Sequence, residues 1–79
     1  MSPENEYYKT SDLSLAAALS VYVKDFLVKK NGPKAVFLFP DTKEVRDTVD
    51  QYYREELRVS PKSYFDQIRF IKSRIYSAT

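Results

Sequence analysis

The spacing of hydrophobic residues changes several times along the chain, and each change marks a new predicted element. Residues 7–10 combine Tyr and Thr, which favour extended backbone, and they predict a short first strand. From Leu13 the apolar residues recur at helical spacing, which predicts a helix that ends between Ser20 and Asp25, with an end near Val23 favoured. Its N-cap is expected to be one of three neighbouring side chains: Thr10, Ser11 or Asp12.

A β-hairpin is predicted next. Extended segments over 26–30 and 35–39 flank Asn31 and Gly32, two residue types that tolerate the positive φ of tight hairpin turns. The 35–39 segment is apolar throughout rather than alternating, which indicates a strand that is covered on both faces or exposes an apolar face. We therefore expect 35–39 to be the central strand of the sheet.

Two further helices follow the hairpin. Asp41 and Glu44 have the spacing of a capping box and predict a helix start. Ser60 followed by Pro61 predicts the start of the last helix, because Ser caps well and Pro suits the first helical position. The predicted apolar stripe of the first of these helices is Val45, Val49, Tyr52, Tyr53 and Leu57. The stripe of the second is Tyr64, Phe65, Ile68, Ile71 and Ile75.

These elements predict an α+β fold in the order β-α-β-β-α-α, with three helices and a three-stranded antiparallel or mixed sheet. Residues 1–6 are polar and are expected to form a flexible N-terminus, which leaves 7–77 as a single domain. A ribbon-helix-helix DNA-binding dimer would also place two helices after a strand. It explains less, because its strand reads bases with polar side chains, whereas 35–39 is apolar.

The composition argues against catalysis. The chain contains no histidine and no cysteine, so it lacks the commonest general base, the usual transition-metal ligands and a thiolate nucleophile. The remaining acids, Asp47, Asp50 and Glu55 or Glu56, lie among cations on a polar helix face, which is typical of solvated surface. We expect a protein that is not an enzyme, with no catalytic residues, metal, cofactor or small-molecule substrate.

The same composition indicates where the protein is found. The absence of cysteine fits a reducing compartment. No apolar run approaches the roughly 18 residues of a membrane span, and the polar, acidic opening is unlike a signal peptide. A cytoplasmic location without membrane contact is therefore expected.

Cations near the hairpin are the first candidates for binding. Lys29, Lys30 and Lys34 flank the predicted turn and could contact a phosphate backbone. The alternative is that they keep the sheet edges soluble. Arg69 and Lys72 extend the basic bias into the last helix, but the net charge of +2 is too small to indicate a nucleic-acid partner alone.

Aromatic residues are the second kind of candidate. Phe70 lies about 200° around the last helix from Ile68 and about 100° from Ile71, so it should point away from the core stripe. We expect it on an intermolecular surface or a second packed face. Tyr7 and Tyr8 alternate along the first strand, which predicts that one ring enters the core and the other stays outside.

One longer pattern runs through most of the chain: Tyr8-Lys9-Thr10-x-Asp12-Leu13-x-Leu15-Ala16-Ala17, then Phe37-x-Phe39, then Leu57-x-Val59 and Phe65 through Tyr76. It resembles an uncharacterised family of small prokaryotic and phage proteins known only as a domain of unknown function. The resemblance implies no catalytic residues, because its motifs are core and capping positions.

The expected function is a non-enzymatic module that binds another protein or a second copy of itself. The alternative is a nucleic-acid-binding accessory protein that uses the basic hairpin tip and the last helix. Inhibition of a host enzyme by a phage or plasmid product is a third hypothesis.

Overall fold

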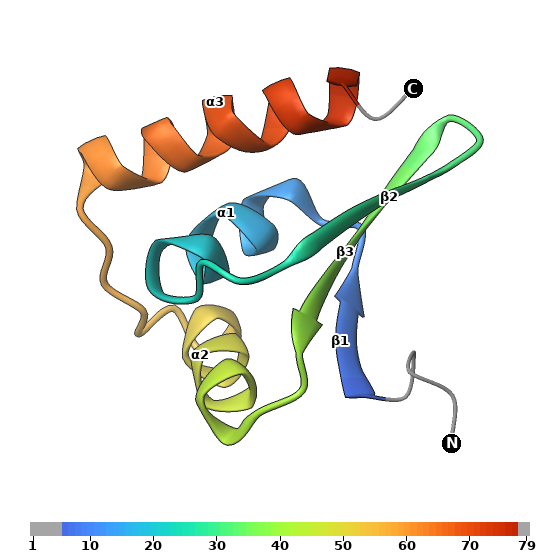
Figure 1. Cartoon of the computed structure of the whole chain (residues 1–79). Helices are drawn as coiled ribbons and strands as arrows, with labels where there is room; N and C mark the ends of the chain where they lie inside the picture. Colours follow the sequence, from blue (N-terminus) through green and yellow to red (C-terminus); the bar gives the residue numbers. More distant parts are fainter. Residues whose placement is uncertain (1–5, 78–79) are drawn as a thin grey trace.

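Six elements follow one another in the predicted order, and the α+β class is confirmed (Figure 1). The computed structural model describes residues 6–77, so the expected flexible N-terminus lies outside the described residues except for Glu6. The elements are β1 (Tyr7–Thr10), α1 (Leu13–Tyr22), β2 (Leu27–Asn31), β3 (Lys34–Pro40), α2 (Lys43–Tyr53) and α3 (Pro61–Ser77).

The sheet is antiparallel throughout and has the order β1-β3-β2, so the predicted central strand is confirmed. Tyr8 lies opposite Phe39, and Val28 lies opposite Phe37. Directly opposed residues of antiparallel strands point to the same face, and neighbours along a strand point to opposite faces. These four side chains therefore share one face, which we call the inner sheet face.

All three helices pack on the inner sheet face (Figure 1). Every residue from Leu15 to Ser20 is buried, because α1 contacts both α2 and α3 and lies over the sheet. The single polar group in this run is satisfied: Ser20 Oγ donates to the carbonyl oxygen of Ala17 at 2.8 Å. Phe26 completes the core by stacking on Phe39, with ring centroids 4.8 Å apart.

The helix starts follow local capping chemistry. Asp12 is the N-cap of α1, and its carboxylate accepts from the backbone N–H of Ser14 at 2.9 Å. α1 ends at Tyr22 with Val23 as its C-cap, as predicted. Ser60 also caps α3 as predicted, because the N–H of Ser63 donates to Ser60 Oγ at 3.5 Å.

The predicted capping box of α2 is wrong. Thr42, not Asp41, is the N-cap, and its Oγ1 accepts from the backbone N–H of Val45 at 3.2 Å. The helix starts one residue later than expected. Glu44 is therefore the second helical residue, whereas the acid of a capping box is the third. Asp41 instead lies 3.8 Å from the guanidinium of Arg46.

The predicted apolar stripe of α2 extends too far. Leu57 lies beyond the helix, which ends at Tyr53, and the Tyr53 ring is 65% exposed. The reason is local: Glu55 has a positive φ of 61°, a left-handed conformation that turns the chain away from the helix axis.

Phe65 is a second correction, because it is 60% exposed rather than part of the core. The buried side of α3 is centred on Tyr64, Ile68 and Ile71, which recur at helical spacing. Phe65 lies about 100° around the helix from Tyr64, and this rotation carries its ring out of the interface.

The hairpin is confirmed, but its turn is shifted by one residue. Asn31 pairs with Lys34, so Gly32 and Pro33 form the two-residue turn. Gly32 has a φ of 65°, as the first central residue of a type II′ turn requires. Nothing lies within 4 Å of a Cβ built at this glycine, so backbone conformation rather than space favours glycine here.

Candidate interaction surfaces

The face of the sheet opposite the helices carries its own apolar group. The register places five apolar side chains there: Tyr7, Leu27, Val36, Leu38 and Pro40. We call these residues, together with Lys9, Lys29 and Lys34, the outer sheet face. None of the described helices packs on this face (Figure 1). The uninterrupted apolar run of β3 is thus explained by a strand whose two faces carry two different apolar groups.

Exposure varies across the outer sheet face. Leu38 is enclosed, at 3% exposure, at the middle of the central strand. Leu27 lies opposite it on β2 and is 44% exposed. Val36 and Pro40 are half-buried. The face therefore has a closed centre and an accessible apolar side along β2.

The three hairpin lysines do not form one surface. Lys29 lies opposite Val36 on the neighbouring strand. Lys34 lies two residues before Val36 on β3, so its side chain points to the same face, and both lysines belong to the outer sheet face. Lys30 lies opposite Ala35 and points to the inner sheet face. Lys9, which sequence reasoning did not select, joins the outer sheet face opposite Leu38.

Two acidic residues lie at the end of the sheet opposite the hairpin. A hollow of about 200 Å³ there is lined by Glu6, Tyr7, Asp25, Phe26, Leu27 and Pro40. Pairing at this end continues past the strand, since the N–H of Asp41 donates to the carbonyl oxygen of Glu6 at 2.8 Å. Strand alternation directs Glu6, next to Tyr7, toward the inner sheet face, whereas Asp25, two residues before Leu27, has the parity of the outer sheet face. The outer sheet face is thus basic at the hairpin and has the carboxylate of Asp25 at the opposite end.

Phe70 points away from the core, as its position on α3 predicts, and is 50% exposed. It has a neighbour on its own chain, because the guanidinium carbon of Arg74 lies 5.8 Å from the Phe70 ring centroid. The same guanidinium lies 5.1 Å from the Phe26 ring. Phe70 therefore lies at the rim of a small cation–aromatic group that joins α3 to the start of β2.

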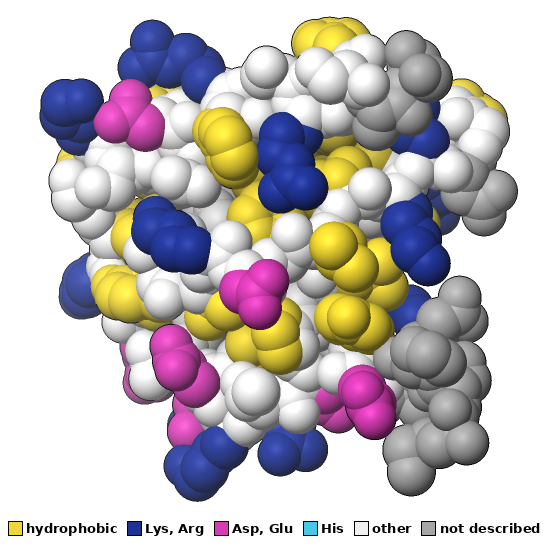
Figure 2. All heavy atoms as spheres, viewed as in Figure 1, with side chains coloured by type: hydrophobic (Ala, Val, Ile, Leu, Met, Phe, Trp, Pro, Cys, Tyr) yellow, Lys and Arg dark blue, Asp and Glu magenta, His cyan; other side chains and the backbone are white. Residues whose placement is uncertain are grey.

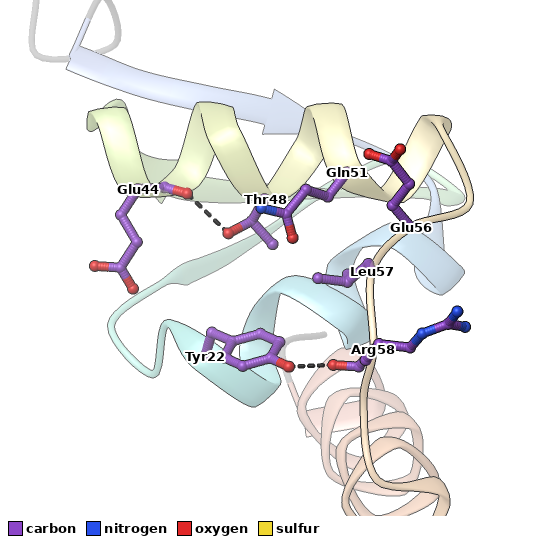
Figure 3. Close-up of a pocket in the computed structure, with 7 residues that line it drawn as sticks. All are labelled: Tyr22, Glu44, Thr48, Gln51, Glu56, Leu57 and Arg58. Atoms are coloured by element: carbon purple, nitrogen blue, oxygen red, sulfur yellow. Dashed lines mark hydrogen bonds between the residues drawn. The ribbon is translucent and has the colours of Figure 1, made fainter.

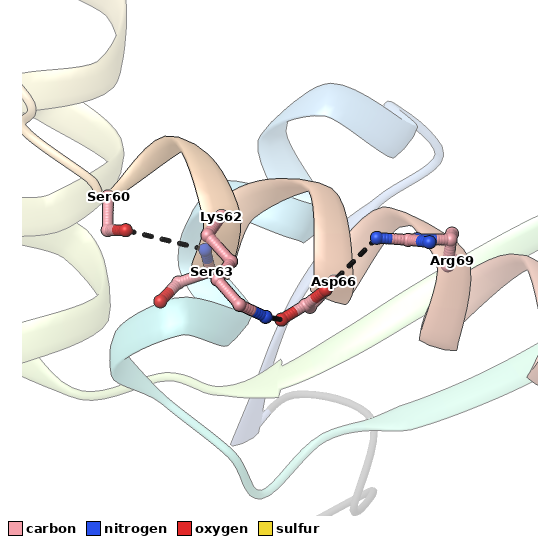
Figure 4. A network of polar contacts seen from close by, with 5 residues as sticks. All are labelled: Ser60, Lys62, Ser63, Asp66 and Arg69. Atoms are coloured by element: carbon pink, nitrogen blue, oxygen red, sulfur yellow. Dashed lines mark hydrogen bonds and ion pairs between the residues drawn. The ribbon is translucent and has the colours of Figure 1, made fainter.

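The cations of α3 differ in their surroundings. Arg69 lies 3.2 Å from Asp66, which also pairs with Lys62 at 3.1 Å (Figure 4). Lys72 is exposed one turn further along. The exposed pairs contribute little stability each, and Asp66 offsets part of the positive charge of this helix.

A hollow of about 350 Å³ lies between the end of α1, α2 and the segment before α3. It is lined by Tyr22, Glu44, Thr48, Gln51, Glu56, Leu57 and Arg58 (Figure 3). Two of its polar groups are already used within the chain. The Tyr22 hydroxyl donates to the carbonyl oxygen of Arg58, and Thr48 Oγ1 donates to that of Glu44 at 2.8 Å.

The acids considered for magnesium lie in a mixed-charge face on α2. Asp47 pairs with Lys43 at 2.8 Å, and Asp50 pairs with Arg54 at 3.1 Å. Across residues 6–77, no three acidic side chains come close enough together to hold a metal ion. Asp47 and Asp50 therefore lie in exposed i,i+4 ion pairs on one helix.

Two tyrosines have altered acidity. Burial raises the pKa of Tyr8 above 10.0, and the charges of Tyr53 and Asp12 add to the effect. Burial likewise raises the pKa of Tyr52. Both hydroxyls are therefore neutral at physiological pH, and neither is poised as a general base.

The fold and its surfaces define a small α+β domain, and the helices described over residues 6–77 all pack on one face of its antiparallel sheet. The chain belongs to the family described as Domain of unknown function (DUF5659), whose model matches residues 5–77. The predicted membership of an uncharacterised domain family is thus confirmed. Neither curated proteins nor solved structures give a significant match. Within the described part of the chain, no helix is both long and apolar enough to cross a membrane.

Proposed function

We propose that this protein is a non-enzymatic interaction module that binds a protein through the outer sheet face. The observation that carries the proposal is Leu27, which is 44% exposed on an apolar face that the described helices leave open. Covering a half-exposed leucine contributes on the order of 1 kcal/mol, and Val36 and Pro40 beside it add to this. Apolar groups of this kind are typical of binding surfaces.

Other exposed apolar residues are more scattered. Yellow hydrophobic side chains form several separate patches in Figure 2, with lysine and arginine between them. Tyr53 lies on α2, whereas Phe65 and Tyr76 lie on α3. The outer sheet face differs because its apolar side chains come from three adjacent strands held by one hydrogen-bonded register.

The composition supports binding over catalysis, since neither histidine nor cysteine is present. The lack of cysteine also supports a cytoplasmic setting, which is part of the proposal together with a prokaryotic or phage origin.

The test is affinity capture from the native host with three baits: the wild type, Leu27→Lys and the control Phe65→Lys. We expect the wild type and the control to retain the same protein, and Leu27→Lys to lose it, because a lysine places a charge in the proposed contact. Nuclease treatment in parallel separates direct from nucleic-acid-bridged capture. Equal capture by all three baits would contradict the outer sheet face as the binding surface.

A second candidate function is nucleic-acid binding. The observation in its favour is that Lys9, Lys29 and Lys34 share the outer sheet face with the aromatic ring of Tyr7. Cations and an aromatic ring on one sheet suit phosphates and stacked bases. Fluorescence anisotropy with single- and double-stranded DNA and RNA tests it. Affinity that falls steeply with salt supports this function, and no affinity at low salt excludes it.

A further inference from the structure

We infer that the partner of the outer sheet face is a second copy of this chain, packed sheet to sheet with its strands antiparallel to those of the first. This inference rests on the proposed function and names the partner. The symmetry axis lies between the two sheets and runs across the strands, so each copy places its hairpin over the opposite end of the other.

The charges of the outer sheet face are self-complementary in this orientation. Lys29 and Lys34 lie at the hairpin end, whereas Glu6 and Asp25 line the hollow at the other end. Reversing one copy places Lys34 of each chain near Asp25 of the other, and it places the stem of Lys29 over the partner's Leu27. The parallel orientation would instead place Lys34 near its own equivalent, and like charges in contact oppose association.

The spacing of residues along β3 agrees with this arrangement. Val36 and Leu38 both belong to the outer sheet face and lie one residue to either side of Phe37. An axis at the level of Phe37 places Val36 over the partner's Leu38. Lys34 and Pro40 are each three residues from Phe37, about 10 Å along an antiparallel strand, so Lys34 reaches the partner's acidic hollow.

Other partners fit the two ends less well. A nucleic acid or an acidic peptide would be attracted to Lys34 but repelled by Asp25. A basic peptide would meet the reverse problem. A second copy is matched at both ends by the same contacts, each made twice.

The size of the face indicates a weak dimer. Three strands at about 4.8 Å spacing and a central strand about 24 Å long give a face of on the order of 350 Å² for each copy. Twice this area is below the roughly 1,200 Å² of a standard stable interface. We therefore expect association at high protein concentration and dissociation on dilution.

The test uses sedimentation at a series of concentrations up to about 1 mM, a range that detects weak association. We expect Lys34→Glu and Asp25→Lys each to weaken dimerisation at least roughly tenfold, because either change makes both charge contacts of the dimer repulsive. A mixture of the two variants should associate again, since in the mixed dimer both contacts are attractive. The doubly substituted chain should also recover self-association.

Circular dichroism of each variant checks that it is folded, and the recovery in the mixture provides the same control. The control Lys62→Glu changes charge equally on α3 and should leave association unchanged, because Lys62 lies outside the outer sheet face. A wild type that stays monomeric at about 1 mM, or a mixture that does not recover, overturns the inference. Loss of association in the Lys62→Glu control would also overturn it.

Failure of the inference and failure of the proposed function are distinguishable. If the wild type is monomeric but Leu27→Lys loses a captured host protein, the outer sheet face binds a different protein and only the inference fails. If Leu27→Lys changes neither the sedimentation of the protein nor the capture of a host protein, the inference and the proposed function both fail. Binding of nucleic acid without self-association supports the second candidate function instead.

Discussion

Ile71 and Phe65 provide a direct test of how α3 sits on the domain. Both residues fall on the apolar stripe expected from spacing, yet Ile71 is 0% exposed and Phe65 is 60% exposed. Replacing each by alanine therefore removes very different amounts of packing. We expect Ile71→Ala to destabilise the domain strongly and Phe65→Ala to leave it almost unchanged.

The magnitude for Ile71 follows from its burial. Removing a fully buried isoleucine side chain costs roughly 2–5 kcal/mol, and the upper half of the range applies where the surroundings cannot collapse. Ile71 lies in the same core cluster as Leu15 and Phe39, on a helix that packs along α1. Domains have roughly 0.05–0.15 kcal/mol of stability per residue, so this one change removes a large part of the total.

The expected change in the free energy of unfolding for Phe65→Ala is close to zero for two reasons. Its ring contacts that of Tyr64 edge to face, with centroids 6.2 Å apart, which is a small loss. Alanine also has the higher helix propensity, by a few tenths of a kcal/mol, and offsets that loss.

The assay is urea unfolding followed by circular dichroism. With a slope of about 1 kcal/mol per molar urea, typical of a small domain, Ile71→Ala should lower the midpoint by about 3 M. Phe65→Ala should stay within about 0.5 kcal/mol of the wild type. If Phe65→Ala were as destabilising as Ile71→Ala, the rotation of α3 about its axis described above would be wrong.

Three further predictions concern caps, the turn and acidity. Asp12→Ala should lower the free energy of unfolding by about 1 kcal/mol, because the α1 amides lose their acceptor, while the control Ser11→Ala should change it little. Gly32→Ala should cost about 1 kcal/mol in the same urea assay, since its φ of 65° disfavours a side chain even where space exists; an unchanged midpoint would contradict that conformation. Because the pKa values of Tyr8 and Tyr52 are raised in the folded state, their contribution to stability is complete below pH 10 and is lost as pH rises further. Unfolding measured between pH 9 and about 11.5 should show this loss, and Tyr8→Phe should reduce it; a pH dependence identical to that of the wild type would refute the assignment.

The element order was predictable because each segment has a local signal. A tight turn needs glycine at positive φ, a helix start needs a side-chain acceptor, and both leave recognisable residues such as Gly32, Asp12 and Ser60. Element ends were less predictable. Leu57 continues the spacing of α2, but the left-handed Glu55 ends the helical course before it, and glutamate carries no sequence signal for that conformation.

The candidate surface was only partly predictable. Lys29 and Lys34 stood out because they lie close together in the sequence, and Lys30 stood out for the same reason although it points to the inner sheet face. The acidic end could not be found in this way. Glu6 and Asp25 are far apart along the chain and meet only where β1 and β2 flank the same end of β3.

The sequence by itself determined the α+β class, the order of strands and helices, the central position of β3 and the poor supply of catalytic groups. These properties depend on residue type and on spacing within one segment. Only the tertiary structure decided which side of α3 is buried, which lysines share a face and how charge is distributed along the sheet. Those properties depend on strand register and on how each helix is rotated against its neighbours, and both are set by contacts between residues distant in sequence.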